Sequence, residues 1–241
     1  LSDSQYLHAT KALDQIEKTV LHHAAGSYEH SLRWFTEFQS SRTQSIKTIL
    51  NGLPESERMK IGSMRDWDGV TALHDASRMG DLHSVKELLA IYPKSQHPQM
   101  VNMQDQTGRT VLHHALRSFS LELVQFFVRL LPEWQYLQAV VMQDTEGQTP
   151  LHYAVQRGQH DYVLALLNSL PESQRLRVVS IQDGNGNHAF HYTTHYGRID
   201  TSRVILALYP EAQHLQVICM QDRKGETVFH RACSFGETQY F

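Results

Sequence analysis

The stretch Thr149-Pro150-Leu151-His152-Tyr153-Ala154 is one copy of a pattern, Thr-x-Leu-His-x-Ala, that recurs along this chain of 241 residues. Other copies begin at Thr71 and Thr110, and weaker copies begin at His188 and Thr227, so that each lies 39 residues after the one before it. A fixed period of this length indicates stacked supersecondary units and not one closed globular core. We therefore expect function to lie on a surface that runs across units.

The same period holds outside the motif, because a proline, an aspartate and a glycine recur in register. They are Pro54, Pro93, Pro132, Pro171 and Pro210; Asp66, Asp105, Asp144, Asp183 and Asp222; Gly69, Gly108, Gly147, Gly186 and Gly225. An earlier copy of the motif begins at Thr19, 52 residues before Thr71. The first unit therefore contains 13 additional residues.

Within one unit, the residues predict two helices. Thr71 is suited to cap a short helix over residues 72–79, and Gly80 can adopt the left-handed conformation that ends it. Gly158, Gly197 and Gly236 repeat this ending, whereas Phe119 replaces the glycine in one unit, where we expect local strain. A second helix follows, with one apolar face at helical spacing. In the unit that begins at Asp66, this face consists of Leu82, Val85, Leu88 and Leu89.

Two further elements complete the unit. Pro171 followed by Glu172 is typical of a helix start, so we expect an additional short helix in every unit. The stretch Asp183-Gly184-Asn185-Gly186-Asn187 has the chemistry of a tight hairpin turn. The apolar residue of each motif should form one continuous core ridge. These residues are Leu73, Leu112, Leu151, Phe190 and Phe229.

The turn, the two helices and the Thr-x-Leu-His-x-Ala signature together resemble the ankyrin-repeat family, and the match is best from Asp144 to Leu167. The resemblance implies an all-α ankyrin-repeat solenoid with short hairpin loops. The additional short helix explains why the period is 39 and not the family's usual length of about 33. The implied organisation is an N-terminal capping segment and first repeat with the insertion at residues 1–65, repeats at residues 66–104, 105–143, 144–182 and 183–221, and a partial repeat at residues 222–241.

The composition argues against several classes of protein. The formal net charge of −3 gives no basic footprint for nucleic acid or for an acidic membrane surface. The two cysteines, Cys219 and Cys233, do not imply a disulfide framework and suit a reducing compartment such as the cytoplasm. No apolar run reaches the roughly 20 residues that span a bilayer. Because the chain begins with Leu1 and stops at Phe241 inside a unit, we expect a part of a longer protein, and we expect that part to be a monomer.

The recurring histidines suggest a metal site, but the expected distance between them argues against it. Equivalent residues on stacked helices lie about 8–10 Å apart, too far to share one ion. In ankyrin repeats this histidine makes hydrogen bonds that join repeats, and we expect that role here. His191 and His195 could chelate zinc, and Cys219 or Cys233 could act as a nucleophile, but no recognisable partner residues complete either site. We therefore expect no metal, no cofactor and no catalytic residue.

Protein recognition is the remaining hypothesis. In the ankyrin family, hairpin tips and the exposed side of each first helix line a concave surface that binds other proteins. By register, the candidate protein-binding residues are Trp67, Asp75, Arg78, His114, Arg117, Tyr153, Arg157, Tyr192, His195, Tyr196, Arg231 and Phe235. Tyr, Trp and Arg are enriched at binding hot spots, although solvated positions can also be aromatic by chance. The mixed charges of the tips favour a specific protein partner over a polyanion.

Several alternatives stay open at this point. The insertion at residues 28–41 is either a cap on the first unit or a second docking surface. The recurring Pro-Glu-x-Gln sequence, together with the long repeats, also resembles ankyrin-bearing effectors that intracellular bacteria deliver into host cytoplasm. A rival hypothesis is that the array recruits substrates for an enzyme whose catalytic domain lies outside these residues. A third is a self-associating scaffold.

Overall fold

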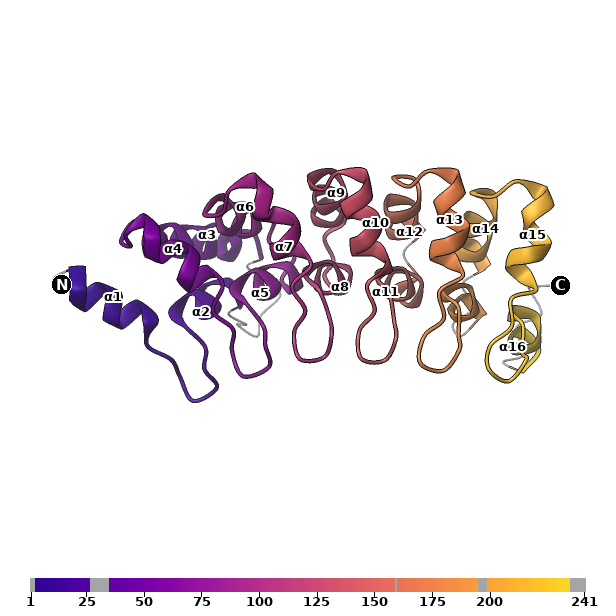
Figure 1. The fold of residues 1–241 in the computed structure, drawn as a ribbon, viewed down its shortest axis with the longest axis horizontal. Coiled ribbons are helices and arrows are strands. Elements are labelled where there is room, and N and C mark those ends of the chain that lie inside the picture. The colour runs from indigo at the N-terminus through magenta and orange to yellow at the C-terminus, as the bar shows by residue number, and fades with distance from the viewer. Residues whose placement is uncertain (1–2, 27–34, 159, 195–198, 235–241) are drawn as a thin grey trace. The chain divides into compact units, whose positions relative to one another are not determined.

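The computed structural model describes residues 3–26, 35–158, 160–194 and 199–234. It divides into two compact units, Leu1–Leu123 and Val124–Phe241. Both units are built from helices joined by turns, as Figure 1 shows. No strand occurs among the described residues, in which two isolated bridges close turns, Gln104 with Thr110 and Gln182 with His188.

In the first unit, the first helices of successive repeats pack on one another, α2 on α5 and α5 on α8, while α3 packs on α6. The bounds are α1 (Asp3–Lys11), α2 (Val20–Gly26), α3 (Phe35–Asn51), α4 (Glu55–Gly62), α5 (Ala72–Arg78), α6 (Leu82–Ala90), η2 (Lys94–Gln96), α7 (His97–Val101) and α8 (Val111–Arg117), with α9 (Leu121–Leu130) starting at the end of the unit.

The second unit repeats the arrangement, with α11 packed on η3, η3 on α16, and α12 on α14. The bounds are α10 (Glu133–Val141), α11 (Pro150–Arg157), α12 (His160–Leu167), α13 (Glu172–Val179), η3 (Ala189–Thr194), α14 (Ile199–Ala207), α15 (Glu211–Ile218) and α16 (Val228–Ser234). The predicted all-α repeat fold is confirmed. The additional helix is present as α4, α7, α10, α13 and α15.

The signature threonine and histidine start each first helix together. Thr71 donates its N–H (3.2 Å) and shares its hydroxyl (2.8 Å) with Nδ1 of His74. Because Nδ1 accepts, Nε2 carries the proton and bonds to the carbonyl of Met103 at 2.9 Å, near the end of the same repeat. In His22, His152 and His191, Nε2 instead reaches a carbonyl oxygen of the next repeat, at 2.9, 3.1 and 3.0 Å. The predicted structural role of these histidines is confirmed.

The additional helix is attached through one donor near its start. Arg175 on α13 donates Nε to the carbonyls of Leu167 and Leu170, both at 3.1 Å, where α12 ends. Arg58, His97 and His214 occupy the equivalent position and bond to carbonyls at the ends of α3, α6 and α14. These carbonyls are the acceptors that a helix end leaves without intrahelical partners. In these four repeats the Pro-initiated helix therefore closes the helix before it, whereas Tyr136 of α10 donates its hydroxyl to the carbonyl of Leu166 in the following repeat.

The core lies where the sequence places it. The motif side chains Leu73 and Leu112 in the first unit are 5% and 1% exposed, and Leu151 and Phe190 in the second are 1% and 2% exposed. Phe229 is only half-buried. The predicted face of the second helix is also buried, from Leu82 to Leu89 on α6.

Helix endings follow the prediction with one correction. Gly80 and Gly158 adopt φ of +70° and +64°, while Gly197 and Gly236 lie outside the described residues. Phe119 does not take this left-handed conformation, since Glu17 is the one described non-glycine residue with positive φ. Instead α8 stops at Ser118, which is extended with φ −77° and ψ 170°. The prediction of local strain at Phe119 is therefore wrong.

One further element differs from the expectation. The weak motif copy at residues 188–193 forms the 3-10 helix η3. The hydroxyls of Thr193 and Thr194 bond to the carbonyls of Phe190 and His191, both at 2.8 Å, and compete with the backbone donors of an α-helix. Residues 28–34 of the insertion lie outside the described residues, so neither the cap nor the docking hypothesis for it is tested.

Candidate functional site

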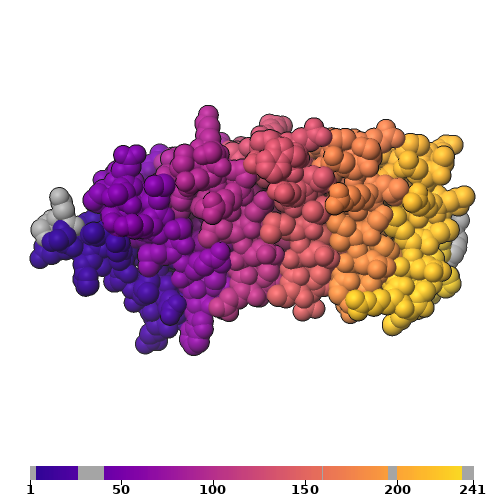
Figure 2. Space-filling view, in the orientation of Figure 1, coloured from indigo at the N-terminus to yellow at the C-terminus, as the bar shows by residue number. Residues whose placement is uncertain are grey.

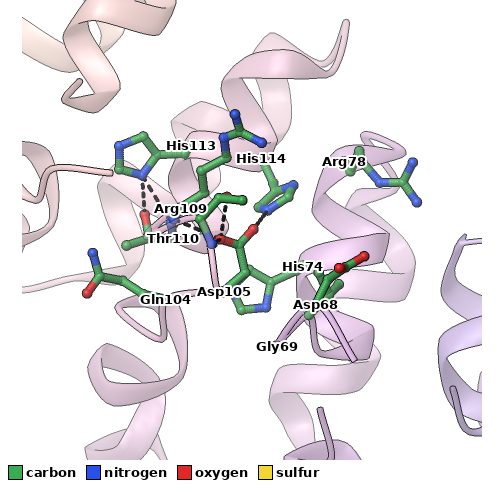
Figure 3. Close-up of polar contacts among 12 residues, drawn as sticks. Asp68, Gly69, His74, Arg78, Gln104, Asp105, Arg109, Thr110, His113 and His114 are labelled. Carbon is green, nitrogen blue, oxygen red and sulfur yellow. Dashed lines mark hydrogen bonds and ion pairs between the residues drawn. The ribbon is translucent and has the colours of Figure 1, made fainter. Parts of the chain in front are cut away.

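Each turn is shaped by its aspartate. Asp105 accepts the N–H group of Arg109 on Oδ1 at 3.0 Å, as Figure 3 shows. The same oxygen accepts the N–H group of Thr107 at 2.8 Å. The same two backbone bonds recur at Asp14, Asp66, Asp144, Asp183 and Asp222. An aspartate that bonds to its own following backbone stabilises a tight turn. Each tip is therefore a pre-formed element.

The second oxygen of this aspartate is bound by the residue that follows the signature histidine, nine residues later. This position varies in type but supplies a donor in most repeats. The pairs are His23 with Asp14 (2.8 Å), His114 with Asp105 (2.8 Å), Tyr153 with Asp144 (2.7 Å), Tyr192 with Asp183 (2.5 Å) and Arg231 with Asp222 (3.0 Å). We call this pair the turn latch. It fixes each turn against its own first helix.

The repeat that contains α5 is different, because its latch position is an acid. Asp75 faces the turn in which Asp66 stands, and both side chains are nearly buried. Lys18, from the preceding turn, lies 3.6 Å from Asp66 Oδ2 and 3.5 Å from Asp75 Oδ2. Arg78 donates to Asp75 Oδ1 at 2.7 Å. Two cations therefore neutralise two buried carboxylates.

A buried group of titratable residues lies between α5 and α8. The rings of His74 and His114 meet edge to face, with centroids 5.3 Å apart, as Figure 3 shows together with Asp105. Burial, and then the nearby His114, lower the pKa of His74 from 6.5 to about 4. Burial acts to raise the pKa of Asp105, but bonds from His114 and Thr107 lower it below its usual value. His74 is therefore neutral and Asp105 is ionised at neutral pH.

The structure corrects the expected exposure of several predicted binding residues. Asp75, His114 and Tyr153 are 1%, 6% and 7% exposed, and all three are latch residues. Tyr192 and Arg231 are half-buried latch residues. The polar groups of the last four bond to the turn aspartates, and the carboxylate of Asp75 pairs with Lys18 and Arg78. A role in binding stays a prediction for them, but any contact would involve little of their surface.

Other predicted residues are accessible. Trp67 is 65% exposed on the turn before α5, and Arg117 and Arg157 are exposed at the ends of α8 and α11. Arg78 is half-buried at the end of α5. In the first unit, the packing of α5 on α8 brings Arg78 and Arg117 to equivalent positions of adjacent repeats. The remaining predicted residues lie outside the described part of the chain. They are His195, Tyr196 and Phe235.

The residue pattern missed the exposure of two apolar residues on the first turn. Leu13 and Ile16 are 49% and 48% exposed, and the N–H of Trp67 bonds to the carbonyl of Ile16 at 3.0 Å. Aligning the first turn with the others reveals the signal, because later turns carry polar residues at these positions. The latch also has a sequence signal, an aspartate nine residues before the variable position.

In His22, His74 and His152, both ring nitrogens are occupied, by a threonine on one side and a backbone carbonyl on the other. Within the described ranges, no group of three or more His, Cys, Asp and Glu side chains is arranged to hold a metal ion. None of the described helices combines the length and apolar character that crossing a membrane requires.

Comparison with known proteins agrees with this architecture. The family model described as ankyrin repeats (3 copies) matches residues 96–175, and the model of a single ankyrin repeat matches residues 68–98. No curated protein matches the chain. Ankyrin repeats indicate a protein–protein interaction module. The matches, the histidine bonds between repeats and the paired helices together show that this chain contains ankyrin repeats.

Proposed function

We propose that this chain binds a partner protein through its turn tips and the exposed ends of its first helices, and that it catalyses no reaction. The proposal is supported by the ankyrin-repeat matches. The accessible candidate residues are Trp67, Arg78 and Arg117 in the first unit and Arg157 in the second. The observation that carries the proposal is the exposure of Trp67 on a pre-formed turn.

The turn before α5 suits an anchor residue. Asp66 Oδ1 accepts the N–H groups of Asp68 and Val70, and the N–H of Trp67 is bound to Ile16. Little backbone freedom is then lost when a partner covers the indole, and such preorganisation lowers the entropic cost of association. Exposed Trp and Arg supply large contact areas and directed hydrogen bonds, which are typical of hot spots.

The bonding of the buried histidines supports a non-catalytic role. A general base must accept a proton from a substrate within hydrogen-bond reach. His74, His152 and His191 are buried, and each donates Nε2 to a backbone carbonyl. Burial lowers the pKa of all three. These groups support the fold.

The test is partner capture by crosslinking with a photoreactive group at Thr107, followed by mass spectrometry. Trp67→Ala should remove the captured partner and leave thermal unfolding unchanged. Trp134→Ala is the matched control, because Trp134 is 63% exposed but lies on α10. Equal capture by both variants would exclude Trp67 as an anchor. Loss of capture together with a lowered unfolding temperature would show a structural role instead.

The finer hypotheses are also proposals. The resemblance to bacterial effectors supports a host protein as partner and host cytoplasm as the compartment. The alternative is a recruiting segment of a larger enzyme, which a catalytic domain in the full reading frame would favour. Light scattering across concentrations tests the expected monomer against a self-associating scaffold.

A further inference from the structure

The loop between α8 and α9 presents an aromatic side chain at a position where other repeats have a glycine. Phe119 is 84% exposed, which is the largest value among the exposed large apolar side chains of the described residues. In the α5 and α11 repeats, the equivalent residues are Gly80 and Gly158, which end the first helix in the left-handed conformation. The α8 repeat therefore carries an exposed aromatic ring in place of this helix ending.

Two serines hold the loop on either side of the ring. Ser118 donates its hydroxyl to the carbonyl of Ala115 at 2.6 Å, at the end of α8, and accepts the N–H of Ser120 at 3.3 Å. The hydroxyl of Ser120 accepts the N–H of Leu123 at 3.2 Å and so caps the start of α9. Because the backbone around Phe119 is already ordered, little freedom is lost when a partner covers the ring.

The surface around the ring continues onto the end of α5. A Cβ placed on Gly80 would lie 3.0 Å from the Cβ of Ser120 and 3.2 Å from the Cβ of Ser118, so the loops that follow α5 and α8 are in contact. The turns, by contrast, precede these helices, and the turn before α5 projects at the lower edge of Figure 2, in purple. The ring and the end of α5 therefore form one surface, at the other end of the first helices from the turns.

Cations flank the ring on this surface. Arg117 is exposed two residues before Phe119. Arg78, its equivalent on α5, has a side chain that is 31% exposed, whereas its partner Asp75 is nearly buried. The arginine, and not the carboxylate, is therefore presented to a ligand. Glu122 is exposed in the first turn of α9 and opposes the positive charge from one side.

We propose that this surface, which we call the arginine–phenylalanine patch (Arg78, Arg117 and Phe119), binds a segment of the partner protein in which an apolar side chain stands beside acidic residues. The inference rests on the proposed function and names the chemistry of the partner. The apolar side chain of the segment covers the ring of Phe119, and its carboxylates pair with the arginines. Guanidinium groups bind carboxylates through paired hydrogen bonds, and complementary charge selects an acidic segment over a basic one.

The experiment selects short random peptides from a display library on the full chain, without assuming a partner. We expect the selected peptides to combine an apolar residue with Asp or Glu. Phe119→Ala should weaken their binding by at least about tenfold, whereas Phe119→Leu keeps an apolar contact and should retain most of the affinity. Trp134→Ala removes an exposed aromatic side chain from α10 and should leave binding unchanged. Thermal unfolding should be the same for all three variants, because both rings are exposed.

Charge variants test the acidic part of the segment. Arg117→Gln should weaken peptide binding several-fold and make the remaining affinity less sensitive to salt. Arg117→Lys should recover part of the loss, because it restores the charge without the paired geometry. Glu122→Gln removes a carboxylate that repels the segment and should strengthen binding. Unchanged affinity in both Arg117→Gln and Glu122→Gln would contradict the charge part of the inference.

Three results would overturn the inference as a whole. Selection of basic peptides, or of peptides that bind Phe119→Ala as tightly as the unsubstituted chain, would place recognition outside the patch. Concentration-dependent light scattering that disappears in Phe119→Ala would make a second copy of the chain the occupant. Failure to select any peptide would exclude a short segment as the ligand. In each case, partner crosslinking at Thr107 that still depends on Trp67 would leave the proposed function standing.

Discussion

The repeats that contain α5 and α8 differ in the residue that faces the turn aspartate, which is a histidine in the α8 repeat and an aspartate in the α5 repeat. In the α8 repeat, His114 bonds directly to the turn aspartate Asp105 at 2.8 Å. In the α5 repeat, the equivalent residue is Asp75, and Lys18 must come from the preceding turn to neutralise it and Asp66. The repeat geometry therefore specifies where the latch lies but not which charges form it.

This difference has an energetic consequence. The latch of the α8 repeat lies within that repeat, so its turn keeps its partner whatever precedes it. The latch of the α5 repeat depends on its neighbour, which supplies the lysine. A buried carboxylate without a partner is costly, whereas a paired one is tolerated. The variants below test this dependence, from the largest expected effect to the smallest.

Lys18→Met should give the largest loss of stability, about 3 kcal/mol, because it leaves two nearly buried carboxylates with one fewer cation. Urea unfolding followed by circular dichroism measures this. The double variant Lys18→Met, Asp75→His converts the latch to the type in the α8 repeat and should recover most of the loss. If the double variant is no more stable than the single one, charge neutralisation by Lys18 does not explain the stability of this latch.

Acid should destabilise the fold through the histidines. The folded protein holds the pKa of His74 at about 4, while the unfolded chain protonates this residue near 6.5. The contribution is therefore fully present above pH 6.5 and is lost as pH falls from 6.5 through 4, by roughly 2 kcal/mol. Denaturation at several pH values measures the slope. His74→Gln should flatten it, whereas His83→Gln, at an exposed position on α6, should not.

The latch between Tyr153 and Asp144, in the second unit, can be weakened by removing one oxygen atom. Tyr153→Phe removes the hydroxyl that donates to Asp144 at 2.7 Å and should cost about 1.5 kcal/mol, since the acceptor is charged. Thermal unfolding is the measurement, and Tyr162→Phe on α12 is the matched control. An unchanged unfolding temperature for Tyr153→Phe would show that this hydroxyl does not hold the turn.

The smallest effect is expected for the outer cation of the α5 repeat. The side chain of Arg78 is 31% exposed and pairs with Asp75 within one helical turn, so Arg78→Gln should cost less than about 1 kcal/mol. Added salt should reduce the difference further. A loss as large as that of Lys18→Met would mean that Arg78, and not the neighbouring turn, neutralises the latch.

Local chemistry made much of the fold predictable from sequence. Thr71, Gly80 and the phased prolines act through their own backbone, so their positions mark where helices begin and end. The latch was not predicted because it joins residues nine apart whose types differ between repeats. The burial of Asp75 depends on Lys18, from another repeat. Phe119 shows that a helix can end through an extended serine where glycine is absent.

Binding residues were predicted less well for a physical reason. Register places a side chain on a face of its helix, but its neighbours decide whether it is exposed. Tyr153 and Trp67 are both aromatic, yet the first is 7% and the second 65% exposed. Only Tyr153 has an aspartate in position to accept a bond.

The donor near the start of four of the five additional helices, α10 being the exception, has a consequence for how such a chain can change in length. Because Arg175 bonds to the end of the helix that precedes it in its own repeat, a genetic duplication or deletion of 39 codons that begins at a turn aspartate moves both helices together. Recombination in whole copies then keeps the bonds between them. The longer repeat is a ready unit for shuffling, in evolution and in engineering alike.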